Sequence, residues 1–173
     1  MNVLADISIK PSLPGSVLKA ARERHPGQGA KVFLRMEGQA GNVATVAPGR
    51  PLNYVMTFKQ ARDYTLLVAF SSDPGLIDVF DKNALQKELE VHLPGARLQS
   101  SVSHDWNSDP FAKGTWTTYR PGWARNLLPL FQKAVGRIHF ASGDHGEGWR
   151  GTIDGAIGAG ARASHAIRQQ LRG

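Results

Sequence analysis

Residues 136–164 read GRIHFASGDHGEGWRGTIDGAIGAGARAS and predict a strand, a turn and a helix in succession. The apolar run over 137–141 predicts a short strand. Residues 142–148 cannot extend that strand, because glycine and aspartate favour turns. A helix is then expected from Thr152, whose hydroxyl is placed to cap its first turn, through Ala163.

The predicted helix has one face made almost entirely of small residues. A helix N-terminus offers free N–H groups and a partial positive charge, which suit an anionic oxygen or an electron-rich ring edge. Close packing against a neighbouring element also requires small residues, so the pattern alone leaves a ligand site and tight packing open. The residues of this face are Gly151, Gly155, Ala156, Ala159, Gly160 and Ala163.

This segment resembles the C-terminal signature of the flavin-containing amine oxidase family, which includes monoamine oxidases and L-amino-acid oxidases. In that family a strand like GRIYFAG precedes an acidic residue and a GxxxGA helix. Asp144 stands where the family usually has Glu, and Thr152 where many members have an aromatic residue facing the substrate. The resemblance implies that Thr152 borders the substrate and that this region contacts FAD. The implied FAD contacts are Gly143, Asp144, Trp149, Gly151, Thr152, Ile153 and Ala156.

Residues 105–122 are aromatic and turn-rich, which predicts an ordered loop. Large aromatic side chains mostly serve burial, so packing is the simpler role for its tryptophans. The loop is similar to the family segment W-x-x-D-P-x-x-x-G-x-(Y/W), which implies that Trp106 lies beside the flavin and Trp116 helps to wall the substrate cavity. Thr115 stands where monoamine oxidases attach flavin through Cys, and the chain has no Cys. The resemblance therefore implies non-covalent FAD.

A strand is predicted over residues 30–36, with Lys31 near its start. A lysine at a strand edge is usually solvated, and the residues alone favour that role. Residues 25–32 look like a family stretch in which G-x-x-x-K is followed by Val, Ile or Cys, and upstream residues 2–14 look similar as well. The resemblance implies that Lys31 is catalytic, ordering a water near the flavin N5.

The middle of the chain reads as a scaffold of strands and helices. Strands are predicted over 52–58, 65–70 and 97–104, and helices over 14–25, 74–93 and 123–134, the last interrupted at Pro129. The expected fold is α+β: a mixed sheet with flanking helices, as in the amine oxidase substrate-binding domain, plus a C-terminal strand-turn-helix that completes an FAD site. The expected division is between residues 1–104, with the sheet and helices, and residues 105–173, with the flavin-capping loop and the C-terminal strand-turn-helix, packed together as one compact unit.

The composition predicts a folded soluble protein. The chain has 173 residues, 41% of them hydrophobic and 20% charged, enough for one core. It carries no apolar run long enough to span a bilayer, and Asp6 and Lys10 interrupt any signal-peptide pattern. Zero Cys excludes disulfides and agrees with a cytoplasmic location.

The net charge of +7 raises nucleic-acid binding as an alternative function. Its basic residues are dispersed among acids and form no basic tail or recognisable binding motif, which argues against nucleic acid as a partner. The histidines show no metal-ligand spacing, so no metal is expected. The histidines considered are His92, His104, His139 and His145.

The sequence contains no dinucleotide-binding βαβ unit with its Gly-rich turn, which an enzyme of this family needs. We therefore expect this chain to be the small subunit of a split FAD-dependent amine or amino-acid oxidase. The enzyme would be a hetero-oligomer whose second polypeptide carries the dinucleotide-binding unit. The assembled enzyme would oxidise an amine to an imine by hydride transfer to flavin, releasing aldehyde or keto acid, ammonia or amine, and hydrogen peroxide. The alternative is a non-catalytic remnant or interaction module of the same fold.

Overall fold

A computed structural model describes residues 1–172, which form two compact units. One unit, the sheet unit, comprises residues 28–109. The other, the helical unit, joins residues 1–27 to the segment that begins at Pro110. The structure therefore groups the N-terminal residues with the C-terminal segment, whereas the sequence-based division grouped them with the sheet.

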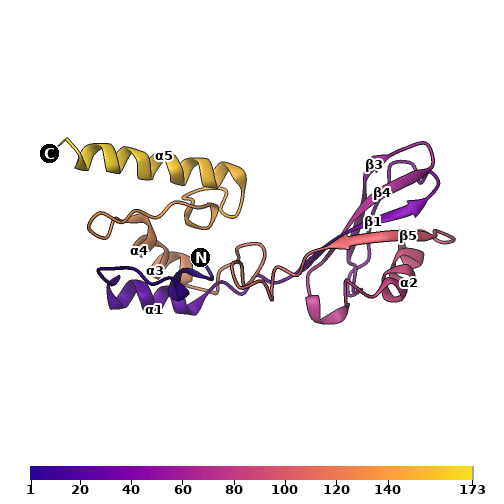
Figure 1. The fold of residues 1–173 in the computed structure, drawn as a ribbon, viewed down its shortest axis with the longest axis horizontal. Helices are drawn as coiled ribbons and strands as arrows, with labels where there is room; N and C mark the ends of the chain where they lie inside the picture. Colours follow the sequence, from indigo (N-terminus) through magenta and orange to yellow (C-terminus); the bar gives the residue numbers. More distant parts are fainter. Residues whose placement is uncertain (173) are drawn as a thin grey trace. The chain divides into compact units, whose positions relative to one another are not determined.

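The sheet unit contains one five-stranded sheet in the order β2-β3-β4-β1-β5, and every pairing is antiparallel (Figure 1). This confirms the α+β fold class, with an antiparallel sheet in place of the mixed one expected. The strands predicted over 30–36, 52–58, 65–70 and 97–104 are all present, within a few residues of their expected ends. β2 was missed, because three residues are too short for an alternating pattern. The strands are β1 (Ala30–Glu37), β2 (Ala44–Val46), β3 (Tyr54–Gln60), β4 (Tyr64–Ser71) and β5 (Leu98–Ser103).

Alternation along β1 sets the two faces of the sheet. Val32 and Leu34 are fully buried on one face, whereas Lys31 and Arg35 are exposed on the other. Helix α2 (Lys82–His92) supplies Leu85 and Leu89 to the core that covers the buried face (Figure 1).

The helix predicted over 74–93 is wrong in its first part. Residues 74–76 form a short 3-10 turn, η2, and the backbone is extended at Ile77. Ile77 and Val79 are buried in alternation with exposed neighbours, so they reach the core from a non-helical segment. α2 begins only after Asp81, whose carboxylate accepts hydrogen bonds from the backbone N–H groups of the first turn.

The helical unit packs residues of three short helices, α1, α3 and α4, into a second apolar core, and also contains the longer helix α5. The break predicted at Pro129 is confirmed, since α3 and α4 are separate helices that meet at Leu127. Trp123 and Phe131, one from each of these helices, are buried in the core. The elements are η1 (Leu4–Asp6), α1 (Gly15–Glu23), α3 (Trp123–Asn126), α4 (Leu128–Gln132), η3 (Gly143–His145) and α5 (Ile153–Gln170).

The strand predicted over 137–141 is wrong. Val135 and Ile138 bond to each other through both backbone pairs, at 2.9 and 3.0 Å, which closes a tight turn at Gly136 with φ of 58°. An apolar run becomes a strand only where a neighbouring strand takes its backbone groups, and here the run folds back on itself. Phe140 packs instead against the second core.

The helix predicted after the turn is confirmed as α5, which continues beyond Ala163 to Gln170. Thr152 is its N-cap: the Oγ1 atom accepts a hydrogen bond from the Gly155 N–H at 3.2 Å. The capping residue and the small-residue pattern were therefore sufficient to place the start of this helix.

Candidate functional site

A stack of rings supports the turn that carries Asp144. Tyr119 stacks on Trp123 at 4.7 Å between centroids, Trp123 on Phe131 at 5.9 Å, and Phe131 on His145 at 5.2 Å. The planes of each pair lie within 13° of parallel. His145 is 5% exposed, so the residue after Asp144 is anchored in the core and the turn has a rigid base.

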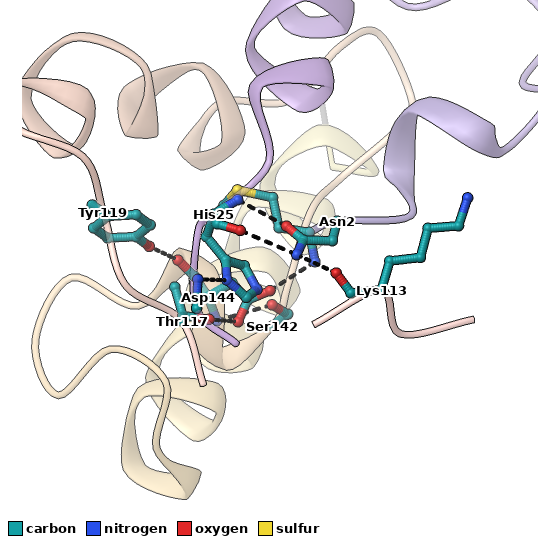
Figure 2. Close-up of polar contacts among 9 residues, drawn as sticks. Asn2, His25, Lys113, Thr117, Tyr119, Ser142 and Asp144 are labelled. Atoms are coloured by element: carbon teal, nitrogen blue, oxygen red, sulfur yellow. Dashed lines mark hydrogen bonds and ion pairs between the residues drawn. The ribbon is translucent and has the colours of Figure 1, made fainter. Parts of the chain in front are cut away.

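Asp144 lies at the centre of a polar cluster in the helical unit (Figure 2). Its carboxylate accepts hydrogen bonds from the Thr117 hydroxyl and from the amino group of Met1, and its carbonyl accepts one from the Tyr119 hydroxyl. The Ser142 hydroxyl accepts from the Asp144 N–H at 3.0 Å. η3 therefore presents Asp144 in one fixed orientation, with the side chain 22% exposed.

These contacts shift the pKa values of two groups in the cluster. Burial alone would raise the pKa of Asp144, but the hydrogen bonds from Met1 and Thr117 outweigh burial and hold that pKa below its ordinary value. Burial, followed by the charge of Asp144, raises the pKa of Tyr119 to about 12. Asp144 is therefore an anion at neutral pH, and Tyr119 keeps the proton that it donates.

Asn2 connects the N-terminal residues to the aromatic loop (Figure 2). Its amide nitrogen donates to the Lys113 carbonyl at 2.8 Å, and its amide oxygen accepts from the His25 N–H at 2.8 Å. Asn2 is 2% exposed, and a Cβ on Gly114 would lie 2.6 Å from its amide nitrogen. Glycine is required at position 114 by this approach and by a φ of 151°.

His25 is buried in the same cluster, and burial lowers its pKa. Its Nδ1 atom accepts a hydrogen bond from the Gly27 N–H at 3.2 Å, which requires that nitrogen to be unprotonated. The imidazole is thus a fixed neutral acceptor, and the segment leading out of α1 is held against the loop.

The start of α5 borders an open depression of about 710 Å³, lined by Trp149, Gly151, Thr152, Ile153 and Asp154. The first four were predicted as cofactor contacts. Trp149 and Ile153 are 77% and 82% exposed. The first-turn N–H groups of α5 and its partial positive charge lie at this depression, which suits an electron-rich or anionic ligand.

Small residues in α5 serve close packing on one side and leave the other side open. Gly155 and Ala159 are buried, and a Cβ on Gly155 would lie 2.5 Å from the Trp149 carbonyl oxygen. Around Gly158 nothing lies within 4 Å of an added Cβ. Close packing therefore accounts for the buried face, Ala156 belongs to the exposed side, and a ligand on that side stays a prediction.

The remaining turn residues hold the depression together. The Gly143 carbonyl accepts from the Gly151 N–H at 3.0 Å, and a Cβ on Gly143 would lie 3.0 Å from the Thr152 carbonyl. Trp149 has a φ of 44°, an uncommon conformation for a bulky residue, and its carbonyl accepts from the Thr152 N–H. Gly143 therefore serves the geometry of the turn.

Two predicted site residues, Lys31 and Trp106, belong to the sheet unit rather than to the helical unit. Lys31 is exposed, with its ammonium nitrogen 4.9 Å from the centre of the Phe33 ring. Trp106 is 49% exposed and meets the His104 ring edge-on at 4.4 Å. Trp116 lies in the helical unit and is 48% exposed. The functional roles of all these residues stay predictions.

Sequence reasoning missed Asn2, His25, Thr117 and Tyr119. They come from segments that are far apart in the chain, and none of them follows a helical or strand period. Their cluster exists only because residues 1–27 fold against the C-terminal segment. The triplet of polar and aromatic residues at 117–119 was the one local signal, and it lay inside the loop already identified.

Two further observations bear on ligands and location. Among residues 1–172, no group of three or more His, Cys, Asp or Glu side chains could hold a metal ion. No helix within the same described range has both the length and the apolar character required to cross a membrane.

The chain is similar in sequence to a family of flavin-dependent enzymes and to several of their known members. The family model for flavin containing amine oxidoreductases matches residues 1–168. The chain is 42% identical to a pseudooxynicotine dehydrogenase of a Pseudomonas species, and 32% identical to a nicotine dehydrogenase of Pseudomonas putida. These matches cover 100% and 99% of this chain but 36% of each relative. An (S)-6-hydroxynicotine oxidase of Paenarthrobacter nicotinovorans is 29% identical over 96% of this chain and 39% of its own length.

Solved structures of putrescine oxidase share the fold. A redesigned double mutant superimposes with a TM-score of 0.83 at 22% identity, covering 97% of this chain and 41% of the oxidase. The wild-type putrescine oxidase bound to putrescine gives the same TM-score at 20% identity, with the same coverage. The chain thus spans a little over a third of the length of the relatives that it matches.

Proposed function

Because the chain belongs to the flavin containing amine oxidoreductase family, we propose that it forms the substrate-facing and flavin-contacting part of an FAD-dependent amine oxidoreductase. The observation that carries the proposal is the depression at the start of α5. Trp149, Gly151, Thr152 and Ile153, each matched to the family's flavin region, line one depression beside a helix N-terminus. Tight packing of the opposite helix face explains Gly155 but leaves this exposed side without a structural role.

The residues of the helical unit fit a non-covalent flavin. Thr115 stands where monoamine oxidases attach the cofactor, and its buried hydroxyl has no hydrogen-bond partner among residues 1–172. A buried hydroxyl without a partner is costly, so a group from outside these residues would satisfy it. The N–H groups at the start of α5 and the side chain of Trp149 would contact the cofactor from the depression. Asp144 would contribute through its remaining acceptor capacity, since a carboxylate offers about four acceptor sites.

When bound, FAD supplies the acceptor for the hydride removed from the carbon beside the amine nitrogen. Lys31 would order a water near the reacting atoms, through its charge and a hydrogen bond. Trp106 would pack beside the flavin, and Trp116 and Thr152 would border the substrate. Thr152 is smaller than the aromatic residue common at its position, which leaves room for a larger amine.

The names of the curated relatives support one substrate class for the proposed enzyme. Three of them are named for nicotine, pseudooxynicotine and 6-hydroxynicotine, and two of these are called dehydrogenases. We therefore propose a nicotine-related amine as the substrate, and an acceptor other than oxygen is compatible with the same site. L-amino-acid oxidases are more distant relatives, at 26% identity.

The proposal includes a second polypeptide that would supply the dinucleotide-binding unit of the enzyme. The relatives extend well beyond the 36% of their length that this chain covers. Exposed Trp149, Ile153 and Ile157 at α5 form an apolar surface that suits such a partner. A chain that keeps the fold without the chemistry, the alternative expected from the sequence, would bind the same partner without activity.

The proposal is tested by co-expressing the chain with a partner that carries the dinucleotide-binding unit of such an enzyme. A yellow complex that oxidises nicotine or pseudooxynicotine supports the proposal, and putrescine and an L-amino acid test the substrate class. A stable but colourless complex would support the non-catalytic alternative. Replacing Lys31 with Met in an active complex should lower turnover while flavin content stays constant.

A further inference from the structure

The sheet unit has an aromatic face opposite the face that α2 covers. Directly opposed residues of antiparallel strands share a face, and the register opposes Lys31 to Phe70 and Phe70 to Tyr54. Phe33 lies on the same side of β1 as Lys31, two residues further along. The proposed catalytic lysine therefore extends from a surface built by aromatic side chains of three adjacent strands.

The ammonium of Lys31 lies near two of these rings. Its Nζ atom is 4.9 Å from the centre of the Phe33 ring and 5.9 Å from the centre of the Phe70 ring. A cation within about 6 Å of a ring centre is attracted by the negative face of the ring. Two rings from neighbouring strands thus attract one charge, which narrows the region that the charge occupies.

The rings of Phe33 and Phe70 each pack against another aromatic ring. Phe58 of β3 meets Phe33 edge-on, with centroids 5.2 Å apart and planes at 77°. Tyr54 of β3 lies 6.0 Å from Phe70 at a tilt of 31°. Because Phe33 and Phe70 each have an aromatic neighbour from β3, the rings cannot rotate away from Lys31 without losing that contact.

The backbone of Lys31 is fixed as well. Its strand pairs with β4 on one side and β5 on the other, and the Ser103 hydroxyl donates to the Lys31 carbonyl at 2.8 Å. A lysine side chain normally rotates about four bonds, so a fixed backbone does not by itself fix the ammonium. The rings of Phe33 and Phe70 supply the constraint at the other end of the side chain.

We infer that Phe33 and Phe70 are positioning residues that hold the Lys31 ammonium where it orders the reactive water. This inference rests on the proposed function of Lys31. Catalytic groups must stay within about 0.5 Å of their productive position, and an unrestrained lysine does not. Substitution of either ring should therefore lower turnover without removing the charge.

The position of the ammonium is tested on the chain alone by reductive ¹³C-methylation of its lysines, which keeps their positive charge. Ring currents should displace the Lys31 signal upfield of the other lysine signals, and its absence from Lys31→Arg identifies it. Phe33→Leu and Phe70→Leu should each move the signal towards the others. Phe80→Leu, at an exposed position in the turn before α2, is the control that should leave the signal in place. A Lys31 signal without an upfield displacement in the unsubstituted chain overturns the inference.

The consequence for turnover is tested in the flavin-loaded complex. Phe33→Leu and Phe70→Leu should lower kcat several-fold with unchanged flavin content, whereas Phe80→Leu should keep the original kcat. Full kcat in both leucine variants, in a complex that Lys31→Met inactivates, overturns the positioning role alone. Full kcat in Lys31→Met overturns the proposed function of Lys31. The positioning role of Phe33 and Phe70 in turnover is then overturned as well, even if the upfield shift of the Lys31 signal is observed.

Discussion

Alanine substitutions at two glycines of α5 should change stability in opposite directions. Gly158 lies in the helix interior with nothing within 4 Å of an added Cβ, so Gly158→Ala should stabilise by about 1 kcal/mol through helix propensity. Gly155→Ala would place a Cβ 2.5 Å from the Trp149 carbonyl oxygen and 3.1 Å from its carbonyl carbon. These Trp149 atoms belong to the backbone, so they cannot move away by a side-chain rotation.

The packing conflict at Gly155 should cost about 1–3 kcal/mol, more than the propensity gain returns. We expect the two variants to differ by about 2 kcal/mol, or roughly 4–8 °C in the unfolding temperature of a chain of this size. Thermal unfolding followed by far-ultraviolet circular dichroism measures the difference. A Gly155→Ala variant as stable as Gly158→Ala would refute the assignment of the buried face of α5 to close packing.

Four further outcomes are expected. Burial, followed by the positive charge of the Met1 amino group, lowers the pKa of His145 to about 4 from its ordinary 6.5. Between these two pH values the unfolded chain binds a proton at His145 that the folded chain does not. The free energy of unfolding should therefore fall by up to about 3 kcal/mol as the pH drops from 6.5 to about 4. His145→Phe, which keeps the stack on Phe131, should flatten that dependence in urea unfolding at a series of pH values, and an unchanged slope would contradict it. Thr117→Val should destabilise by about 1–2 kcal/mol in the same assay, because the Asp144 carboxylate loses a partly buried donor. Thr118→Val, at an exposed position, is its control. In spectrophotometric titration one tyrosine should ionise near pH 12, and that step should vanish in Tyr119→Phe. Acid precipitation of the flavin-loaded complex should leave all flavin in the supernatant, and a yellow pellet would contradict non-covalent binding.

Local patterns in the sequence were sufficient for much of the fold. The strand-forming residues over 30–36 and 65–70 predicted β1 and β4, and the hydroxyl of Thr152 predicted the start of α5. These features depend on neighbours within a few residues, so a pattern in one segment contains the information. Pro129 broke the helix after Trp123 for the same reason.

Features that depend on distant partners were not predictable in this way. Residues 137–141 have strand composition, but no strand forms because Val135 and Ile138 bond to each other. Asn2 donates a hydrogen bond to the Lys113 carbonyl, 111 residues away, and no pattern in either segment predicts this hydrogen bond. The turn around Asp144 was predicted from its glycines and the role of Asp144 from a family resemblance, whereas the hydrogen bonds from Thr117 and Tyr119 are visible only in the structure.

The central claim is that this chain completes a flavin site that oxidises an amine. Its most direct measurement is the anaerobic bleaching of flavin absorbance after a nicotine-related amine is mixed with the FAD-loaded complex of this chain and its dinucleotide-binding partner. We predict rapid bleaching that requires this chain and slows in Lys31→Met at equal flavin content. Bleaching by the FAD-loaded partner alone at the same rate, or no bleaching with any amine in a fully loaded complex, would contradict the claim.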